Sequence, residues 1–351
     1  MRIEGTNSSL ILNQTGSTIA FILADTLGVV HLQKSIVKTI KCPTEYLRWS
    51  ISPDGKWLVL TYYDATNDCN LLNVYETQQL NLSYQLTFSE SLQKIKINNS
   101  GHITGVLGAN KIAFWESALQ GTLDMHSPLV FDEDINHCNL ELHPLKAEFL
   151  LWGKSEYEFE WSGILLGQLS FSSGKIDILE KVPYLDFKES LSWCWLDKYE
   201  KYLACAKDGD LIYLDRELNS VKEQKYRLHQ YTNIMSSVDG KYILHKNYQE
   251  SDESDSSLLE YWVINNLTHQ NFLIKKFSIQ FPTEWLYGIS TEDGITLVSF
   301  NKGYDVEFKR WSLEGNLSED KTISLSPHSD FVVSRITTFR EISRDPNSNI
   351  R

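Results

Sequence analysis

A strand–turn–strand unit that recurs seven times is the feature that most constrains the fold of this chain. In the clearest copy, Ser52-Pro53-Asp54-Gly55 separates two apolar segments. Proline fixes φ near −65° and glycine permits positive φ, so this tetrapeptide predicts a tight turn between antiparallel strands. The other copies contain residues 13–16, 98–101, 143–146, a turn within 191–206, 237–240 and 291–294. Successive turns lie about 40 to 54 residues apart, a period typical of repeated four-stranded sheets.

The strand after each turn is expected to be buried on both faces. Residues 57–63 are almost wholly apolar and lack the alternation of a half-exposed strand. Such a strand needs a neighbouring sheet on either side. The repeat therefore predicts an all-β chain whose four-stranded antiparallel sheets stack around a ring, as the blades of a β-propeller do.

The ends of the third strands extend the pattern. Tyr75-Glu76 and Trp115-Glu116 each place an acid after an aromatic residue, and Asp215 follows Tyr213 two positions later. In these features the sequence resembles the WD40-like β-propellers, whose units carry a turn of the Ser-Pro-Asp-Gly type and a Trp-Asp pair after the third strand. The repeats here are degenerate, because no Trp-Asp dipeptide occurs. The resemblance implies a seven-bladed propeller, with an eight-bladed ring as the minor alternative.

The chain is expected to form one closed domain with a short tail. Residues 1–329 are predicted to be the propeller, and residues 330–351 a C-terminal strand or arm. Residues 321–335 echo the opening hairpin, but too little chain follows them to build an eighth blade. Residues 322–326 are then the outer strand of the last blade, residues 331–342 leave the ring, and residues 1–5 are an alternative closing strand.

Composition indicates the compartment. The N-terminus has no apolar leader, and no apolar run approaches the roughly 18 residues of a membrane span, so we expect a cytoplasmic protein that does not contact a membrane. The five cysteines have no Cys-x-x-Cys spacing, so they are expected to be buried free thiols.

The net charge of −13 argues against direct binding of nucleic acid. The acids concentrate in three runs, which fall in connections that a propeller brings to one face. Exposed aromatic residues beside charges are typical of interface hot spots. The candidate partner-binding residues are Asp132, Glu133, Asp134, Glu156, Tyr157, Glu158, Phe159, Trp161, Tyr248, Glu250, Asp252, Glu253 and Trp285. We expect Glu158, Phe159 and Trp161 to contribute little to core stability, because they lie in a loop.

No catalytic motif stands out. His137, Asn139, Glu141 and His143 share one face of a predicted strand, but they would span about 20 Å, too far for one metal ion. Gly-x-Ser-x-Gly, His-Glu-x-x-His and phosphate-binding glycine motifs are missing from the sequence. We therefore expect a protein that is not an enzyme and needs no cofactor or metal.

Two functions fit these observations best. The first is a non-catalytic scaffold that docks a basic protein partner on its acidic, aromatic face. The alternative is an inhibitor or immunity-type protein that neutralises a basic effector. A metal-dependent propeller hydrolase is the third possibility, and the sequence leaves the oligomeric state open.

Overall fold

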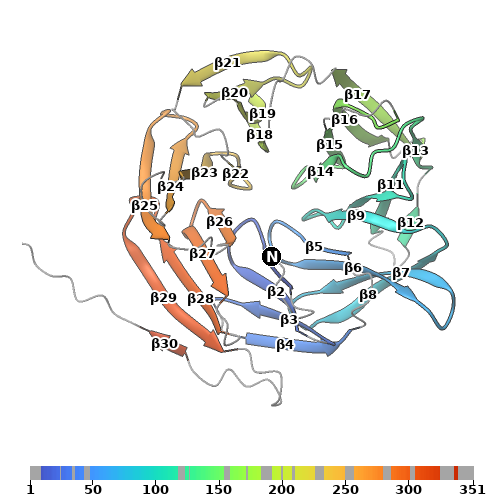
Figure 1. Cartoon of the computed structure of the whole chain (residues 1–351), viewed down its shortest axis with the longest axis horizontal. Coiled ribbons are helices and arrows are strands. Elements are labelled where there is room, and N and C mark those ends of the chain that lie inside the picture. The colour runs from blue at the N-terminus through green and yellow to red at the C-terminus, as the bar shows by residue number, and fades with distance from the viewer. Residues whose placement is uncertain are drawn as a thin grey trace, which may run out of the picture.

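The computed structural model forms a ring of antiparallel sheets around a central axis (Figure 1). It describes residues 9–23, 25–33, 36–42, 48–117, 123–125, 127–153, 159–170, 173–182, 192–198, 201–207, 210–225, 233–249, 257–279, 286–300, 305–324 and 336–338. Within these residues every regular element is a strand, and no helix is present that could span a membrane.

The seven sheets are built in chain order, with the first strand of each nearest the axis. Blade 1 contains β1 (Ser9–Leu12), β2 (Thr18–Leu23), β3 (Thr26–His31) and β4 (Ile36–Lys41). Blade 2 contains β5 (Arg48–Ile51), β6 (Trp57–Asp64), β7 (Cys69–Glu76) and β8 (Asn81–Phe88). Blade 3 contains β9 (Leu92–Ile97), β10 (Ile103–Leu107), β11 (Lys111–Ser117), β12 (Leu123–Met125) and β13 (Leu129–Val130), and its last two strands both pair with β11.

The remaining blades follow the same plan. Blade 4 contains β14 (Asn139–Leu142), β15 (Glu148–Gly153), β16 (Gly163–Ser170) and β17 (Lys175–Val182). Blade 5 contains β18 (Ser192–Lys198), β19 (Lys201–Lys207), β20 (Asp210–Leu214) and β21 (Ser220–Lys225). Blade 6 contains β22 (Asn233–Ser236), β23 (Tyr242–Gln249), β24 (Ser257–Asn265) and β25 (Asn271–Ile279). Blade 7 contains β26 (Leu286–Ser290), β27 (Gly294–Phe300), β28 (Asp305–Trp311), β29 (Leu317–Ser324) and an added strand, β30 (Ile336–Thr338).

The prediction of seven four-stranded antiparallel blades is confirmed. Each of the seven repeated turns joins the first and second strands of one blade, so the turn sequences locate the blades correctly. The predicted outer strand of the last blade, residues 322–326, overlaps β29, which begins earlier. The proposed closing strand at residues 1–5 lies outside the described residues.

The hydrophobic core is divided into seven clusters, one at each interface between neighbouring blades. This arrangement explains why the second strands are apolar on both faces: all six residues of β2 and of β15 are buried. The cluster between blades 7 and 1 joins Leu10 and Phe21 to Val298 and Phe308. Side-chain packing therefore closes the ring, and each blade is formed by one continuous stretch of chain.

The turns between the first and second strands of the blades lie on one face of the disc, which we call the lower face. Neighbouring turns contact one another there. The Thr15 N–H donates to the Pro53 carbonyl (3.2 Å), and the Asn99 N–H donates to the Pro144 carbonyl (2.9 Å). Between them, the Asp54 N–H donates to the Asn99 side-chain oxygen (2.8 Å). The repeated turns therefore bind neighbouring blades together besides reversing the chain. The upper face carries the second-to-third-strand loops and the connections between blades.

The five cysteines are free thiols, and Cys42, Cys138, Cys194 and Cys205 are buried while Cys69 is partly exposed. Burial raises the pKa of Cys42 to about 11 and that of Cys138 to about 12. The thiolate is the form that reacts with alkylating reagents. We expect iodoacetamide to label Cys69 at least about tenfold faster than the other four in the native protein. Peptide mass mapping after a time course would contradict this if a buried cysteine were labelled first.

Candidate protein-binding surface between blades 3 and 4

Two acidic loops meet on the upper face between blades 3 and 4. The Asp134 N–H donates to the Phe159 carbonyl (2.9 Å), and the Trp161 N–H donates to the Asp134 carbonyl (2.9 Å). Asp134 and Glu160 thereby form a parallel bridge. The connection from blade 3 to blade 4 and the loop between β15 and β16 are therefore one hydrogen-bonded unit.

The connection is also anchored to blade 3. The Phe131 N–H donates to the Asn110 carbonyl (2.8 Å), and the Ile135 N–H donates to the Ala109 carbonyl (2.9 Å). The Asn110 side-chain amide donates a hydrogen bond to the Phe131 carbonyl (2.7 Å). Three hydrogen bonds to the β10–β11 loop therefore fix the backbone on both sides of the acidic run.

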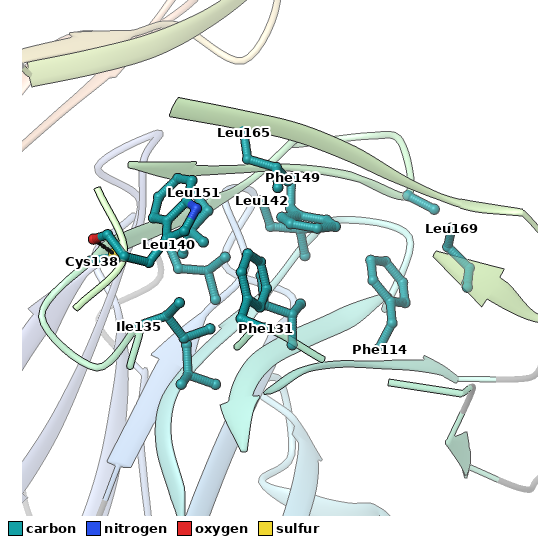
Figure 2. Close-up of a cluster of buried hydrophobic side chains, with 14 residues drawn as sticks. Phe114, Phe131, Ile135, Cys138, Leu140, Leu142, Phe149, Leu151, Leu165 and Leu169 are labelled. Carbon is teal, nitrogen blue, oxygen red and sulfur yellow. Dashed lines mark hydrogen bonds between the residues drawn. The ribbon is translucent and has the colours of Figure 1, made fainter. Parts of the chain in front are cut away.

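A packed core lies directly beneath these loops. Phe131 and Ile135 of the connection point toward Phe149, Leu151 and other apolar side chains of blade 4 (Figure 2). This core gives the two loops a rigid base.

The loop aromatic Trp161 belongs to this core. Its side chain is only 3% exposed and meets Phe131 edge to face, with the ring centroids 5.9 Å apart. The expectation that Trp161 contributes little to core stability is therefore wrong. The physical reason is that the bridge with Asp134 holds the loop against blade 3 and directs the indole into the interface below. Trp161 supports the surface and is not available for direct contact with a partner.

Phe159 lies on the outside of the same loop. Its side chain is 67% exposed, the largest value among the exposed large hydrophobic residues described. Asp132 is exposed, and Glu133, Asp134 and Glu160 are partly exposed. We call Asp132, Glu133, Asp134, Phe159 and Glu160 the acidic surface: an exposed phenylalanine and four carboxyl groups on two loops that are hydrogen-bonded together.

Two contacts of the acidic surface were not predicted from the sequence, one made by Asp134 and one by His137. One carboxylate oxygen of Asp134 accepts a hydrogen bond from the Asn136 N–H (2.7 Å), so this acid also stabilises its own loop. His137 Nδ1 lies 3.8 Å from the Glu160 carboxylate. Sequence spacing gave no sign of the second contact, because the two residues come from different loops.

The other predicted partner-binding residues are not brought together by the described structure. Glu156, Tyr157, Glu158, Glu250, Asp252, Glu253 and Trp285 lie outside the described residues. Tyr248 lies near the end of β23, where its backbone is opposite Leu259, and its side chain is not described. Their roles remain predictions.

The candidate metal-binding strand has structural roles instead. Glu141 pairs with Lys96 of blade 3 (2.8 Å), and this ion pair lines a central cavity of about 200 Å³. His143 is buried, and its Nδ1 accepts hydrogen bonds from the N–H groups of Leu145 and Lys146 (3.1 Å each). Among the described residues, no three His, Cys, Asp or Glu side chains are grouped to hold a metal ion.

One arrangement imitates a cysteine–histidine–carboxylate triad. His137 Nε2 lies 3.5 Å from Cys138 Sγ, and Glu160 lies on the other side of the imidazole. Cys138 is fully buried, however, and burial raises the pKa of its thiol to about 12. A nucleophilic cysteine needs a thiolate that substrate can reach. Cys138 meets neither condition, so this arrangement does not form a nucleophilic site.

Comparison with known proteins defines the fold class. No protein-family model matches the chain, and no curated protein matches its sequence. A chain of the mitotic checkpoint complex matches with 12% identity and a TM-score of 0.56, covering 86% of each chain. Hsv2 of Kluyvelomyces marxianus matches with 10% identity and a TM-score of 0.53, covering 90% of this chain and 98% of Hsv2. The periplasmic gluconolactonase PpgL of Pseudomonas aeruginosa matches with 10% identity and a TM-score of 0.52, covering 89% of this chain and 94% of PpgL.

The fold is a seven-bladed β-propeller, so the propeller fold that the resemblance implied is confirmed. At 10 to 12% identity these similarities establish the fold alone. The matched structures include an enzyme and a member of a protein complex, so function depends on the site rather than on the fold.

Proposed function

We propose that this protein is a non-catalytic interaction scaffold that docks a basic protein partner on its acidic surface. The observation that carries the proposal is Phe159, an exposed aromatic side chain on the β15–β16 loop. This loop is hydrogen-bonded to the connection between blades 3 and 4, and a packed core supports both. Covering a phenylalanine side chain removes apolar area from water, worth about 1.5–3 kcal/mol when burial is complete. The four carboxyl groups on these loops favour a partner that brings positive charge beside its apolar contact.

The rigidity of the surface supports this proposal. A preorganised loop loses less conformational entropy on binding than a mobile one. One of the matched propeller chains is part of the mitotic checkpoint complex, so a propeller of this shape can serve within a protein assembly. We place the protein in the cytoplasm, where reducing conditions maintain free thiols such as those found here.

The proposal is tested by changing the acidic surface without touching the core. In the triple variant Asp132→Asn, Glu133→Gln, Phe159→Ser, the apolar anchor and two negative charges are lost. We expect binding of a partner recovered by affinity capture to weaken at least about tenfold, since one hot-spot residue alone contributes about 2 kcal/mol. Titration calorimetry at two salt concentrations measures this, and binding by the unaltered protein should weaken as salt increases.

Blade 4 offers a matched control. Its outer strand exposes Ile178 between Asp177 and Glu180, so Asp177→Asn, Ile178→Ser, Glu180→Gln removes the same kinds of group elsewhere. The control variant should bind as the unaltered protein does. If both triple variants lost the same amount of affinity, or if the variant containing Phe159→Ser kept full affinity, the acidic surface would not be the docking site.

A further inference from the structure

The outer edge of blade 7 carries an added strand. β30 lies antiparallel to β29, with Lys321 opposite Thr338, Thr322 opposite Thr337 and Ile323 opposite Ile336. Figure 1 shows β30 outside β29 at the rim of the disc. In the described structure, this is the one blade whose outer strand pairs with a further strand on its outer side.

The regularity of β29 makes this edge suitable for an added strand. An outer strand presents unpaired N–H and C=O groups, and a β-bulge disrupts their spacing. The bulge opposite β28 falls near the start of β29, at Ser318, so residues 319–324 keep an unbroken register. In β17 the bulge at Leu179 divides the strand into two shorter runs.

Other outer strands offer shorter regular edges, with one exception. After their bulges, β8 keeps residues 84–88 in register and β25 keeps residues 275–279. β4 has no bulge, and its six residues pair regularly with β3. It is therefore the natural internal comparison for β29.

The described part of the added strand is short. Within the described residues, three residue pairs join β30 to β29. A backbone hydrogen bond contributes about 0.5–1.5 kcal/mol net, so the pairing alone is weak. Attachment to the same chain compensates, because a tether gives the segment a local concentration in the millimolar range.

We propose that the outer edge of blade 7 is a strand-addition site for an extended segment of a partner protein, and that residues 336–338 occupy it as a removable strand. Main-chain hydrogen bonds provide affinity in such sites, and the alternating side chains provide selectivity. The segment in place, Ile336-Thr337-Thr338, indicates a preference for β-branched residues, which fit the pleated surface of a strand. This site is separate from the acidic surface and does not depend on it.

The test removes the chain's own strand and offers a replacement. Proline cannot donate a ladder hydrogen bond, and placing it at two successive positions disrupts whichever N–H faces β29. We would compare the unaltered chain, the Ile336→Pro, Thr337→Pro variant and a Ser348→Pro control altered outside the paired segment. A fluorescent peptide with the sequence of residues 334–341 is the probe, and anisotropy measures its binding.

We expect the double-proline variant to bind the peptide at least about tenfold more tightly than the unaltered chain or the Ser348→Pro control, because its edge is open. A peptide carrying the same two prolines should not bind. Deletion of residues 336–351 provides a second way to open the edge and should give the same increase. Equal peptide binding in all chains, or no binding to either opened chain, would overturn the proposal.

Amide hydrogen exchange shows which strand edge the peptide occupies. Backbone amides in residues 321–324 should exchange faster in the double-proline variant and regain protection when the peptide is added. Amides of β4 should be unaffected in both experiments. Protection that appears on β4, or β29 exchange that is the same in every chain, would show that the edge of blade 7 is not the binding site.

Discussion

Replacing Trp161 with alanine should lower the free energy of unfolding by about 3–5 kcal/mol, the usual cost of truncating a large buried aromatic residue. Trp161 is 3% exposed, meets Phe131 edge to face and fills the core between blades 3 and 4. Truncation leaves a cavity under both acidic loops, and the bridge through Asp134 loses its support. Urea denaturation followed by tryptophan fluorescence and circular dichroism measures the change.

Phe159→Ala is the matched control, because it removes an aromatic side chain two residues away on the same loop. Its side chain is largely exposed, so its unfolding free energy should stay within about 0.5 kcal/mol of the unaltered protein. Trp161→Ala should therefore reduce stability, whereas Phe159→Ala should reduce partner binding alone. A stable Trp161→Ala protein would mean that the indole is not part of the core.

Local chemistry explains why the fold could be predicted from sequence. The turn at Ser52-Pro53-Asp54-Gly55 is determined by residues within the turn itself: the Ser52 hydroxyl donates to the Asp54 carboxylate (2.7 Å), and Gly55 adopts a φ of 76°. A turn of this kind can be recognised from its own residues, without knowing which distant residues lie beside it in the fold. The repetition of these turns gave the number of blades, and the apolar second strands showed that sheets must stack.

The candidate site could be predicted only in part, because it depends on contacts between separate loops. The acidic run at Asp132 was visible in the sequence, but its pairing with the loop of Phe159 requires the fold. Phe159 and Trp161 are two residues apart, yet one is exposed and the other buried. Outside a regular strand, spacing does not determine the direction of a side chain. Sequence alone therefore could not show that Phe159 is exposed and Trp161 is buried.

Two glycines in similar turns differ sharply in how closely a neighbouring blade approaches them. Gly240 has a φ of 68° and Gly315 a φ of 86°, and each N–H closes its turn by donating to a serine carbonyl three residues earlier. A Cβ at Gly240 would lie 2.0 Å from the Leu196 carbonyl oxygen of blade 5, whereas a Cβ at Gly315 would have no neighbour within 4 Å. Alanine at either position incurs the left-handed backbone cost, about 1–2 kcal/mol.

Gly240→Ala should therefore lower the unfolding free energy by about 3 kcal/mol or more, because the clash with blade 5 adds to the backbone cost. Gly315→Ala should lower it by no more than about 2 kcal/mol. The difference measures how closely the turn of blade 6 is pressed against blade 5, where the obstacle is backbone and cannot rotate away. Chemical denaturation of both variants provides the comparison. If the two alanines were equally tolerated, the turn of blade 6 would not be pressed against the Leu196 carbonyl of blade 5, and the left-handed backbone cost alone would account for both losses.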